Sequence, residues 1–172
     1  MPRPLKLFAD TGTLHERISI DEANSVLSTE HYLGPIQRNA LCFGTFVDGE
    51  LVAVQVWNKP TARMLPSDGS WLELSRWCLT ADTPANGGSM QMGYVRKWLR
   101  ANYKPRPVTL VSYSDPVHGH TGTLYKASGW SSSPTHHQER FEATDGRGYP
   151  SGHGSWDGST IQTPKAQWVT TV

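Results

Sequence analysis

The residues with the clearest chemical potential lie in a loop between a predicted strand and a predicted helix. Residues 82–89 end in Asn86, Gly87, Gly88 and Ser89. Glycines let backbone N–H groups approach an anion closely, and the N-terminus of a helix carries partial positive charge. The loop therefore predicts a cradle for a pyrophosphate group, although two glycines before a serine are also frequent at ordinary helix starts.

A second group of polar side chains follows the apolar run at residues 108–113. Ser112, Ser114 and Asp115 stand at the carboxyl end of this predicted strand. In open α/β sheets, ligands collect beyond the carboxyl ends of strands, so this is an expected location for a site. An equally good interpretation is that Asp115 caps the turn before Pro116.

Histidines are locally frequent in the chain. Five of the seven are His31, His118, His120, His136 and His137. Two histidines and a carboxylate such as Asp115 would suit an iron ion. The spacing is not diagnostic, however, and for any one histidine a structural or solvent-exposed role is the more frequent one.

Tyr125 lies in a short predicted helix at residues 122–128, which Gly129 ends. If this helix packs beside the cradle, the phenol can act as a proton donor. A half-buried position in the core is the more common role for a tyrosine with this spacing.

Basic residues gather near the longer predicted helix, at Arg96, Lys97, Arg100, Lys104 and Arg106. Such a run usually solvates one face of a helix, and phosphate contacts with a nucleotide or with DNA are the alternative. The chain carries 16 Lys and Arg against 15 Asp and Glu, a formal charge of +1. The net charge is therefore too small to attract the chain to nucleic acid or to a membrane, and any contact with DNA must come from a local group of basic residues.

The elements that must position these residues can be read from periodicity. We expect a helix at 21–28, a hairpin of strands 41–47 and 51–57 across Asp48 and Gly49, and a third strand at 71–79. A helix at 89–103, a strand at 108–113, the helix at 122–128 and a strand at 138–143 follow. Strands alternating with helices between residues 71 and 130 predict an α/β (α+β) fold with a central mixed sheet in three layers.

The last part of the chain has a different character. Residues 144–172 are rich in Gly, Ser and Thr and show no period before Gln167, Trp168 and Val169. We expect a domain at 1–143 and an irregular tail at 144–172 that packs on or extends it, with one strand at its end.

Length and composition fit a single globular core. The chain has 172 residues, of which 37% are hydrophobic. It has neither an apolar leader nor a run of about 20 apolar residues, which predicts a soluble, intracellular protein without a membrane partner. Cys42 and Cys78 each lie in an apolar predicted strand and lack metal-ligand spacing, so we expect buried, reduced thiols.

The central part of the sequence resembles the GNAT acyltransferases. The resemblance rests on the strand, the loop with Asn86-Gly87-Gly88-Ser89, the helix, and the later segment 125–130 that begins at Tyr125. It implies a GNAT-like three-layer fold whose mixed sheet is mostly antiparallel. It also implies that residues 86–89 bind the pyrophosphate of acyl-CoA and that Tyr125 protonates the departing thiolate.

Within that superfamily, three strings resemble the Mom-type proteins of phages. They are residues 73–76, residues 112–116 with Gly119 and His120, and His31 with Tyr32. The resemblance implies an enzyme that converts the N6 amine of adenine in DNA to a methylcarbamoyl form and so protects phage DNA from restriction in the host cytoplasm. It implies iron, with His31 and Asp115 as ligands or base, Arg76 as an anion or substrate contact, and Tyr125 as acid. DNA and CoA are then the expected partners, and a homodimer is left open.

Two other functions stay open at this level. The first is a GNAT enzyme that acylates a small amine or a hypermodified nucleotide. The second is an accessory binder that keeps the fold without catalysis. For the adenine reaction the base must leave the duplex, and four tryptophans are candidate stacking surfaces, although each is more often core: Trp57, Trp71, Trp77 and Trp130.

Overall fold

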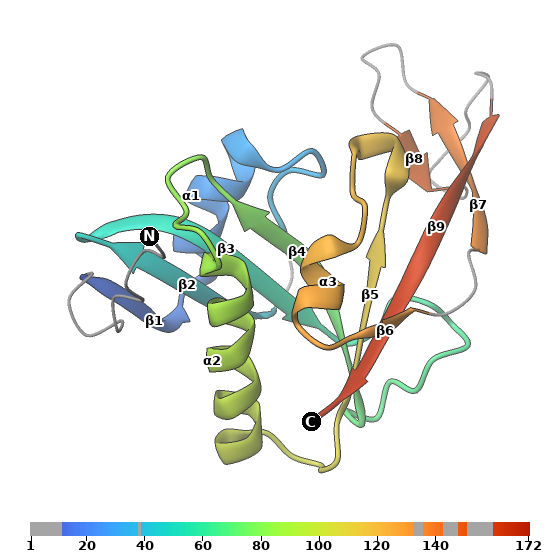
Figure 1. The fold of residues 1–172 in the computed structure, drawn as a ribbon. Helices are drawn as coiled ribbons and strands as arrows, with labels where there is room; N and C mark the ends of the chain where they lie inside the picture. The colour runs from blue at the N-terminus through green and yellow to red at the C-terminus, as the bar shows by residue number, and fades with distance from the viewer. Residues whose placement is uncertain (1–11, 38, 133–135, 143–147, 151–159) are drawn as a thin grey trace, which may run out of the picture.

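The architecture is seen in a computed structural model that describes residues 12–37, 39–132, 136–142, 148–150 and 160–172. The elements follow the order β1 (Thr13–Ile18), α1 (Ile20–Glu30), β2 (Leu41–Val47), β3 (Glu50–Asn58), β4 (Trp71–Leu79), α2 (Gly87–Asn102), β5 (Thr109–Ser114), the 3-10 turn Pro116–His118, α3 (Thr123–Ala127), β6 (Ser131–Ser132), β7 (His136–Glu142), β8 (Gly148–Pro150) and β9 (Thr160–Thr171). Figure 1 shows them as one curved sheet with helices on both sides.

The sheet is mixed and mostly antiparallel, as predicted. Its strand order is β1-β2-β3-β4-β5-β9-β7-β8, with β6 paired to β9. Within the described residues, the parallel pair is β4 with β5, whose connection runs through α2. The predicted hairpin is confirmed: β2 and β3 pair across Asp48 and Gly49, both of which have positive φ.

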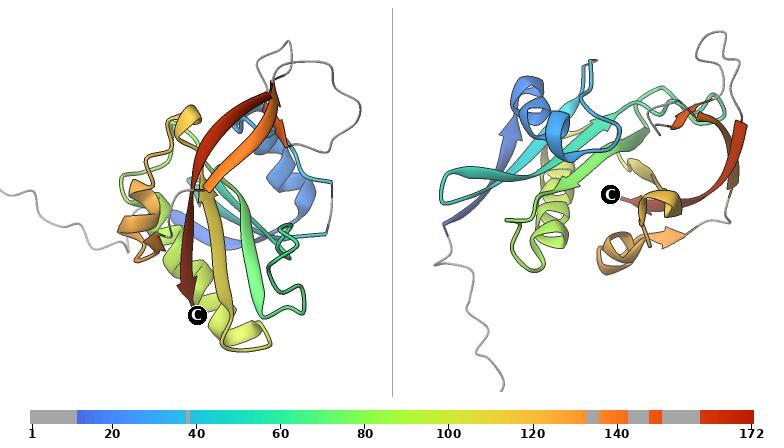
Figure 2. Two further views of the ribbon diagram at one scale, coloured as in Figure 1. Left: turned by 90° about the vertical axis from the view of Figure 1, so that its right-hand side faces the viewer. Right: turned by 90° about the horizontal axis from the view of Figure 1, so that it is seen from above.

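Two apolar clusters fill the two faces of the sheet and make three layers. On one face, α2 places Met92, Val95 and Leu99 against Phe43 and Trp57. On the other face, α1 packs over Cys42, Val54, Val56 and Cys78, with Ala23 and Leu27 as its buried contacts. Figure 2 shows α1 and α2 on opposite sides of the strands.

The cysteine prediction is confirmed. Cys42 and Cys78 are buried free thiols. Burial raises the pKa of the Cys78 thiol to about 11, so it stays protonated and serves as a small apolar side chain.

Helix α1 begins one residue before the predicted position, because Ser19 caps it in a capping box. The Ser19 side chain accepts from the Glu22 N–H, and the Glu22 carboxylate accepts from the Ser19 N–H at 2.8 Å. Among the described residues, no helix has the length and apolar character that crossing a membrane requires.

Two parts of the sheet differ from the sequence-based expectation. Strand β1 was not predicted, because half of its side chains are exposed and it is held by pairing with β2 rather than by an apolar face. The strand expected at the end of residues 144–172 is present as β9, but it is twelve residues long and pairs antiparallel with β5. Of the residues described after 143, β8 and β9 therefore belong to the sheet, and β9 pairs along the edge of β5 opposite β4.

Candidate active site

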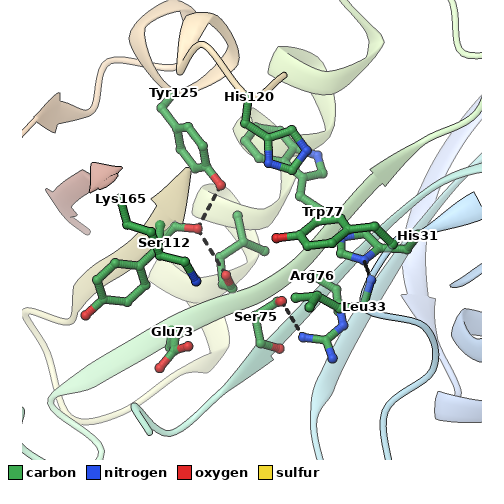
Figure 3. Close-up of a pocket in the computed structure, with 13 residues that line it drawn as sticks. His31, Leu33, Glu73, Ser75, Arg76, Trp77, Ser112, His120, Tyr125 and Lys165 are labelled. Atoms are coloured by element: carbon green, nitrogen blue, oxygen red, sulfur yellow. Dashed lines mark hydrogen bonds between the residues drawn. The ribbon is translucent and has the colours of Figure 1, made fainter. Parts of the chain in front are cut away.

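A pocket opens where β4 and β5 part. The two strands pair only from Trp71 with Thr109 to Glu73 with Val111, although both continue for several residues. The space beyond encloses about 130 Å³. It is lined by His31, Tyr32, Leu33, Glu73, Leu74, Ser75, Arg76, Trp77, Ser112, Tyr113, His120, Tyr125 and Lys165 (Figure 3).

Tyr125 reaches this pocket from α3 and is held by other side chains. Its Oη lies 2.8 Å from Ser112 Oγ, and Ser112 Oγ donates to the Leu74 carbonyl at 3.0 Å. Its ring stacks on Trp168 with the centroids 5.4 Å apart and meets Trp77 edge-on at 5.5 Å. Burial raises the pKa of Tyr125 to about 12, so the phenol is protonated at neutral pH.

His31 stands at the end of α1 in a neutral state. Burial lowers its pKa to about 4, and the charges of Arg76, His120 and His118 act in the same direction. Its Nδ1 lies 3.2 Å from the Leu33 backbone nitrogen, which can only donate, so Nδ1 accepts. The proton of the neutral ring is therefore on Nε2, which makes His31 a hydrogen-bond donor for a ligand.

Aromatic rings form one rim of the pocket. Tyr32 stacks on His31 at 4.9 Å and on His118 at 3.9 Å, and it meets His120 at 5.4 Å. Burial lowers the pKa of His120. A flat, uncharged ring is the kind of ligand that such a stack suits.

Arg76 joins β4 to the loop after α1. Its Nε donates to the Gly34 carbonyl at 3.2 Å, and Nη1 donates to the Ser75 carbonyl at 2.8 Å. A register shift between Val56 and Trp57 leaves Ser75 as an extra residue of β4 beside Arg76. The bulge thus sets the direction of a cation that lines the pocket.

Glu73 brings a carboxylate to the pocket. Its Oε2 accepts from the backbone N–H of Thr61 at 2.8 Å and from the Thr61 hydroxyl at 3.1 Å. The side chain is only 8% exposed, so these bonds hold it in one place. Burial raises the pKa of the nearby Tyr113, and the negative charge of Glu73 acts in the same direction.

The loop before α2 has features that fit an anion. Helix α2 has sixteen residues, carries no acidic residue in its first turn, and begins after Asn86 in the left-handed conformation. A Cβ on Gly88 would lie 2.8 Å from Leu124 Cδ1, and one on Gly87 would lie 2.7 Å from Thr83 Cγ2. The two glycines are therefore also required for packing, which the sequence pattern does not reveal.

The prediction of a metal finds no support among the described side chains. They contain no group of three or more His, Cys, Asp and Glu placed to hold a metal ion. Asp115 is 1% exposed and does not line the pocket that His31 lines. Its backbone carbonyl accepts from the backbone N–H groups of His118 and His120, so the chain turns directly after Asp115. The residues described do not fit iron, and no step is assigned to a metal.

The model of the Mom protein family matches residues 14–169. The chain belongs to this family. No curated protein sequence matches it.

Several solved acetyltransferases share the fold of this Mom family protein. The ribosomal-protein-S18-alanine N-acetyltransferase from Escherichia coli is 13% identical with a TM-score of 0.61, over 92% of this chain and 93% of that one. An N-acetyltransferase from Staphylococcus aureus is 12% identical with a TM-score of 0.58, over 92% and 97%. An acetyltransferase from Bacillus subtilis in complex with CoA is 14% identical with a TM-score of 0.55, over 94% and 99%. The GNAT-like fold and the Mom family resemblance are thus both confirmed, and they support the expectation of a transferase.

The Mom family pocket brings together three of the four predicted catalytic residues. His31, Arg76 and Tyr125 line it, whereas Asp115 lies outside its lining. Of the four candidate tryptophans, Trp77 lines the pocket, while Trp57 and Trp130 are core residues. His136 and His137 have side chains outside the described residues.

Other lining residues of this Mom family protein were not singled out from the sequence. Glu73 belongs to the segment 73–76 that resembles Mom-type proteins, but no function was predicted for it. Lys165 lies in the segment expected to be irregular. An alternation of Trp71, Glu73 and Ser75 along a strand with apolar neighbours could have flagged Glu73 as a buried acid. Lys165 carried no comparable signal, because only the pairing of β9 with β5 brings it to the site.

Proposed function

We propose that this Mom family protein modifies the N6 amine of adenine in phage DNA by a methylcarbamoyl-type transfer that protects the DNA from restriction in the host cytoplasm. The observation that carries the proposal is the shared pocket of His31, Arg76 and Tyr125 in a chain of this family.

The reaction needs one proton acceptor and one proton donor. The N6 amine is conjugated with the purine ring and is a weak nucleophile, so its N–H must be taken by a base as nitrogen attacks the carbonyl carbon. Glu73 is the carboxylate among the described lining residues and is the candidate base. Tyr125, protonated at neutral pH, is the candidate donor to the leaving group.

His31 and Arg76 supply polarity around the carbonyl. Neutral His31 presents Nε2–H as a donor, and Arg76 is a fixed cation on the bulged part of β4. Donors of this kind stabilise the negative charge that develops on a carbonyl oxygen under attack. We assign these two residues to that role, in place of a metal.

Acyl-CoA is the candidate donor. Residues Asn86, Gly87, Gly88 and Ser89 at the start of α2 would hold its pyrophosphate, since no acidic side chain opposes an anion in that turn. When bound, a thioester that carries the methylcarbamoyl group would supply an activated carbonyl carbon, and attack by the N6 nitrogen would release CoA as its thiolate.

An adenine in a duplex cannot enter a pocket between two strands of a sheet. The base must therefore leave the stack, and the rings of Tyr32, His31 and His118 at the rim offer it a new stacking surface. Trp77 within the pocket offers a second one.

The experiment is the nucleoside composition of DNA from cells that express the protein. Mass spectrometry should detect a modified deoxyadenosine with the intact protein and none with Tyr125→Phe. Tyr94→Phe is the matched control, because Tyr94 packs beside Phe43 and His15 away from the pocket and should leave the modification intact. An unmodified adenosine profile with soluble, folded protein contradicts the proposal.

The second candidate function is acylation of a small amine or a hypermodified nucleotide. The small pocket of about 130 Å³ and the near-neutral charge favour it. Calorimetry with acetyl-CoA and a panel of amines separates the two. Acetyl-CoA turnover on a free amine without any change in DNA would support the second function.

A further inference from the structure

The point at which β4 and β5 part is bridged by a side chain. Backbone pairing ends at Glu73 with Val111, so Leu74 and Ser112 are the next residues in register. There the Ser112 hydroxyl donates to the Leu74 carbonyl at 3.0 Å. Ser112 is 1% exposed, which removes water as a competing partner.

The same hydroxyl contacts the phenol of Tyr125, and the two bonds fix where each proton lies. A serine has one O–H, and a carbonyl oxygen can only accept. Because the Ser112 proton goes to Leu74, Ser112 Oγ must accept the Tyr125 proton across the 2.8 Å between the two oxygens. In the resting protein, the phenol proton therefore points to Ser112.

The Tyr125 ring has little freedom to move away from this contact. Trp168 stacks on it at 5.4 Å with an interplanar angle of 10°, and Trp77 and Trp130 meet it edge-on, each at 5.5 Å. Trp168 is itself held by the bond from its Nε1 to Ser114 Oγ at 2.9 Å. Figure 3 shows the Tyr125 and Ser112 oxygens joined by this hydrogen bond, and rotation about each C–O bond moves only the hydroxyl hydrogen.

We propose that Ser112 is a positioning residue for Tyr125, whose hydroxyl accepts from the phenol at rest and turns to donate to the phenolate once the phenol has given up its proton. This rests on the proposed role of Tyr125 as acid. In that step the Tyr125 O–H bond breaks, its electron pair stays on oxygen, and the proton forms an S–H bond on the thiolate leaving group of a thioester donor. The Ser112 O–H bond stays intact and only rotates away from Leu74.

When the Ser112 O–H turns from the Leu74 carbonyl to the Tyr125 oxygen, the phenolate is stabilised. A hydrogen bond to a charged oxygen is about twice as strong as a neutral one, so the new bond outweighs the one that the Leu74 carbonyl loses. Among three tryptophans, the phenolate otherwise has little polar support, and burial and Tyr32 both raise the pKa of Tyr125 while the Ser112 bond opposes them. The other charged or titratable groups that face the same pocket are His31, Tyr32, Glu73, Arg76, Tyr113, His120 and Lys165, and the Lys126 Nζ lies 6.0 Å from the centroid of the Trp168 ring.

The test measures the ionisation of Tyr125 itself. Site-specific 3,5-difluorotyrosine at position 125 makes the phenol more acidic, so that a ¹⁹F NMR titration falls in a range where the protein stays folded. In the Ser112→Ala background the ionisation constant should fall about tenfold or more, as expected for losing a donor to a charged group. Ser112→Thr keeps the hydroxyl and should stay within about twofold of the intact protein.

Equal ionisation constants in the Ser112→Ala and intact proteins overturn the proposal. If Ser112→Ala does not fold, Ser112→Cys replaces it, since a thiol of similar size is a much weaker donor. An ionisation constant in Ser112→Cys equal to that of the intact protein would also overturn the proposal.

The titration is independent of the proposed reaction. It follows one fluorinated ring and needs neither DNA nor acyl-CoA, so it tests the positioning role even when no DNA modification is found. Conversely, DNA modification that persists in Tyr125→Phe contradicts the acid role and leaves the titration result standing.

Discussion

The carboxylate of Glu73 accepts a hydrogen bond from the backbone N–H of Thr61 at 2.8 Å. If Glu73 is the base, Glu73→Gln should lower the rate of adenine modification by about 100-fold or more, because the amide cannot accept a proton. Its carbonyl oxygen can still accept from Thr61, so the free energy of unfolding should change by about 1 kcal/mol or less. A mass-spectrometric time course and denaturant unfolding measure the two effects.

The control for Glu73 is Glu50→Gln at the β2–β3 turn, which removes a charge far from the pocket. It should change neither the rate nor the stability noticeably. A Glu73→Gln protein with the rate of the intact protein would rule out Glu73 as base.

Tyr125→Phe should lower the rate by about 10²–10⁴-fold, the usual contribution of a general acid. Its stability should stay within about 1–2 kcal/mol of the intact protein, since the ring and its contacts with Trp77, Trp130 and Trp168 remain. Single-turnover rates together with thermal unfolding check this. Loss of rate accompanied by unfolding would instead indicate a structural role.

His31 makes stability depend on pH. Burial is the main cause that lowers its pKa from 6.5 to about 4, so between these values the unfolded chain binds a proton that the folded chain does not. The free energy of unfolding should therefore fall by on the order of 2 kcal/mol, through His31 alone, as the pH drops from about 6.5 to 4. Above about pH 6.5, His31 should make no pH-dependent contribution.

The measurement for His31 is denaturant unfolding of the intact protein and of His31→Asn at several pH values. Asparagine offers an oxygen to the Leu33 N–H but does not titrate. The difference in free energy of unfolding between the two proteins at pH 8 is the baseline. At pH 4 the intact protein should have lost more of its free energy of unfolding than His31→Asn. A constant difference across this range would contradict the low pKa.

Two glycines with the same backbone angle form a matched pair. Gly119 and Gly122 both have φ of 76°, but an added Cβ meets nothing within 4 Å at Gly119 and would overlap the Trp168 indole at Gly122. Gly119→Ala should cost only the left-handed strain of about 1–2 kcal/mol. Gly122→Ala should cost about 2 kcal/mol more, since a buried indole must shift.

Gly122→Ala should also lower the modification rate, because Trp168 is the ring that stacks on Tyr125. Thermal unfolding and the rate of modification are measured for both variants. Equal stabilities of the two variants would show that Trp168 moves without cost.

Local sequence signals determined most of the elements of this protein. The Asp48-Gly49 turn fixes the β2–β3 hairpin because both residues adopt positive φ. The period of Met92, Val95 and Leu99 fixes the buried face of α2. Both signals are local, and local backbone preferences and periodicity do not depend on distant partners.

Family strings in the sequence identified His31, Arg76 and Tyr125, and the structure gathers them at one pocket. They could be found because they occur within recognisable motifs. Asp115 carried the same kind of signal, but its position after β5 puts it outside the lining. Which way a side chain points beyond the end of a strand is set by the turn that follows, and no pattern of residue types encodes it.

The tertiary structure alone decided where β4 and β5 part and what fills the gap. Backbone pairing stops after Glu73 and Val111, which exposes Glu73 to the pocket and leaves Ser112 to bridge the strands. Strand β9, from a segment without regular pattern, then brings Lys165 to the lining and Trp168 to the Tyr125 ring. Strand pairing joins residues far apart in the chain, so its register depends on the whole sheet and cannot be read from any one segment.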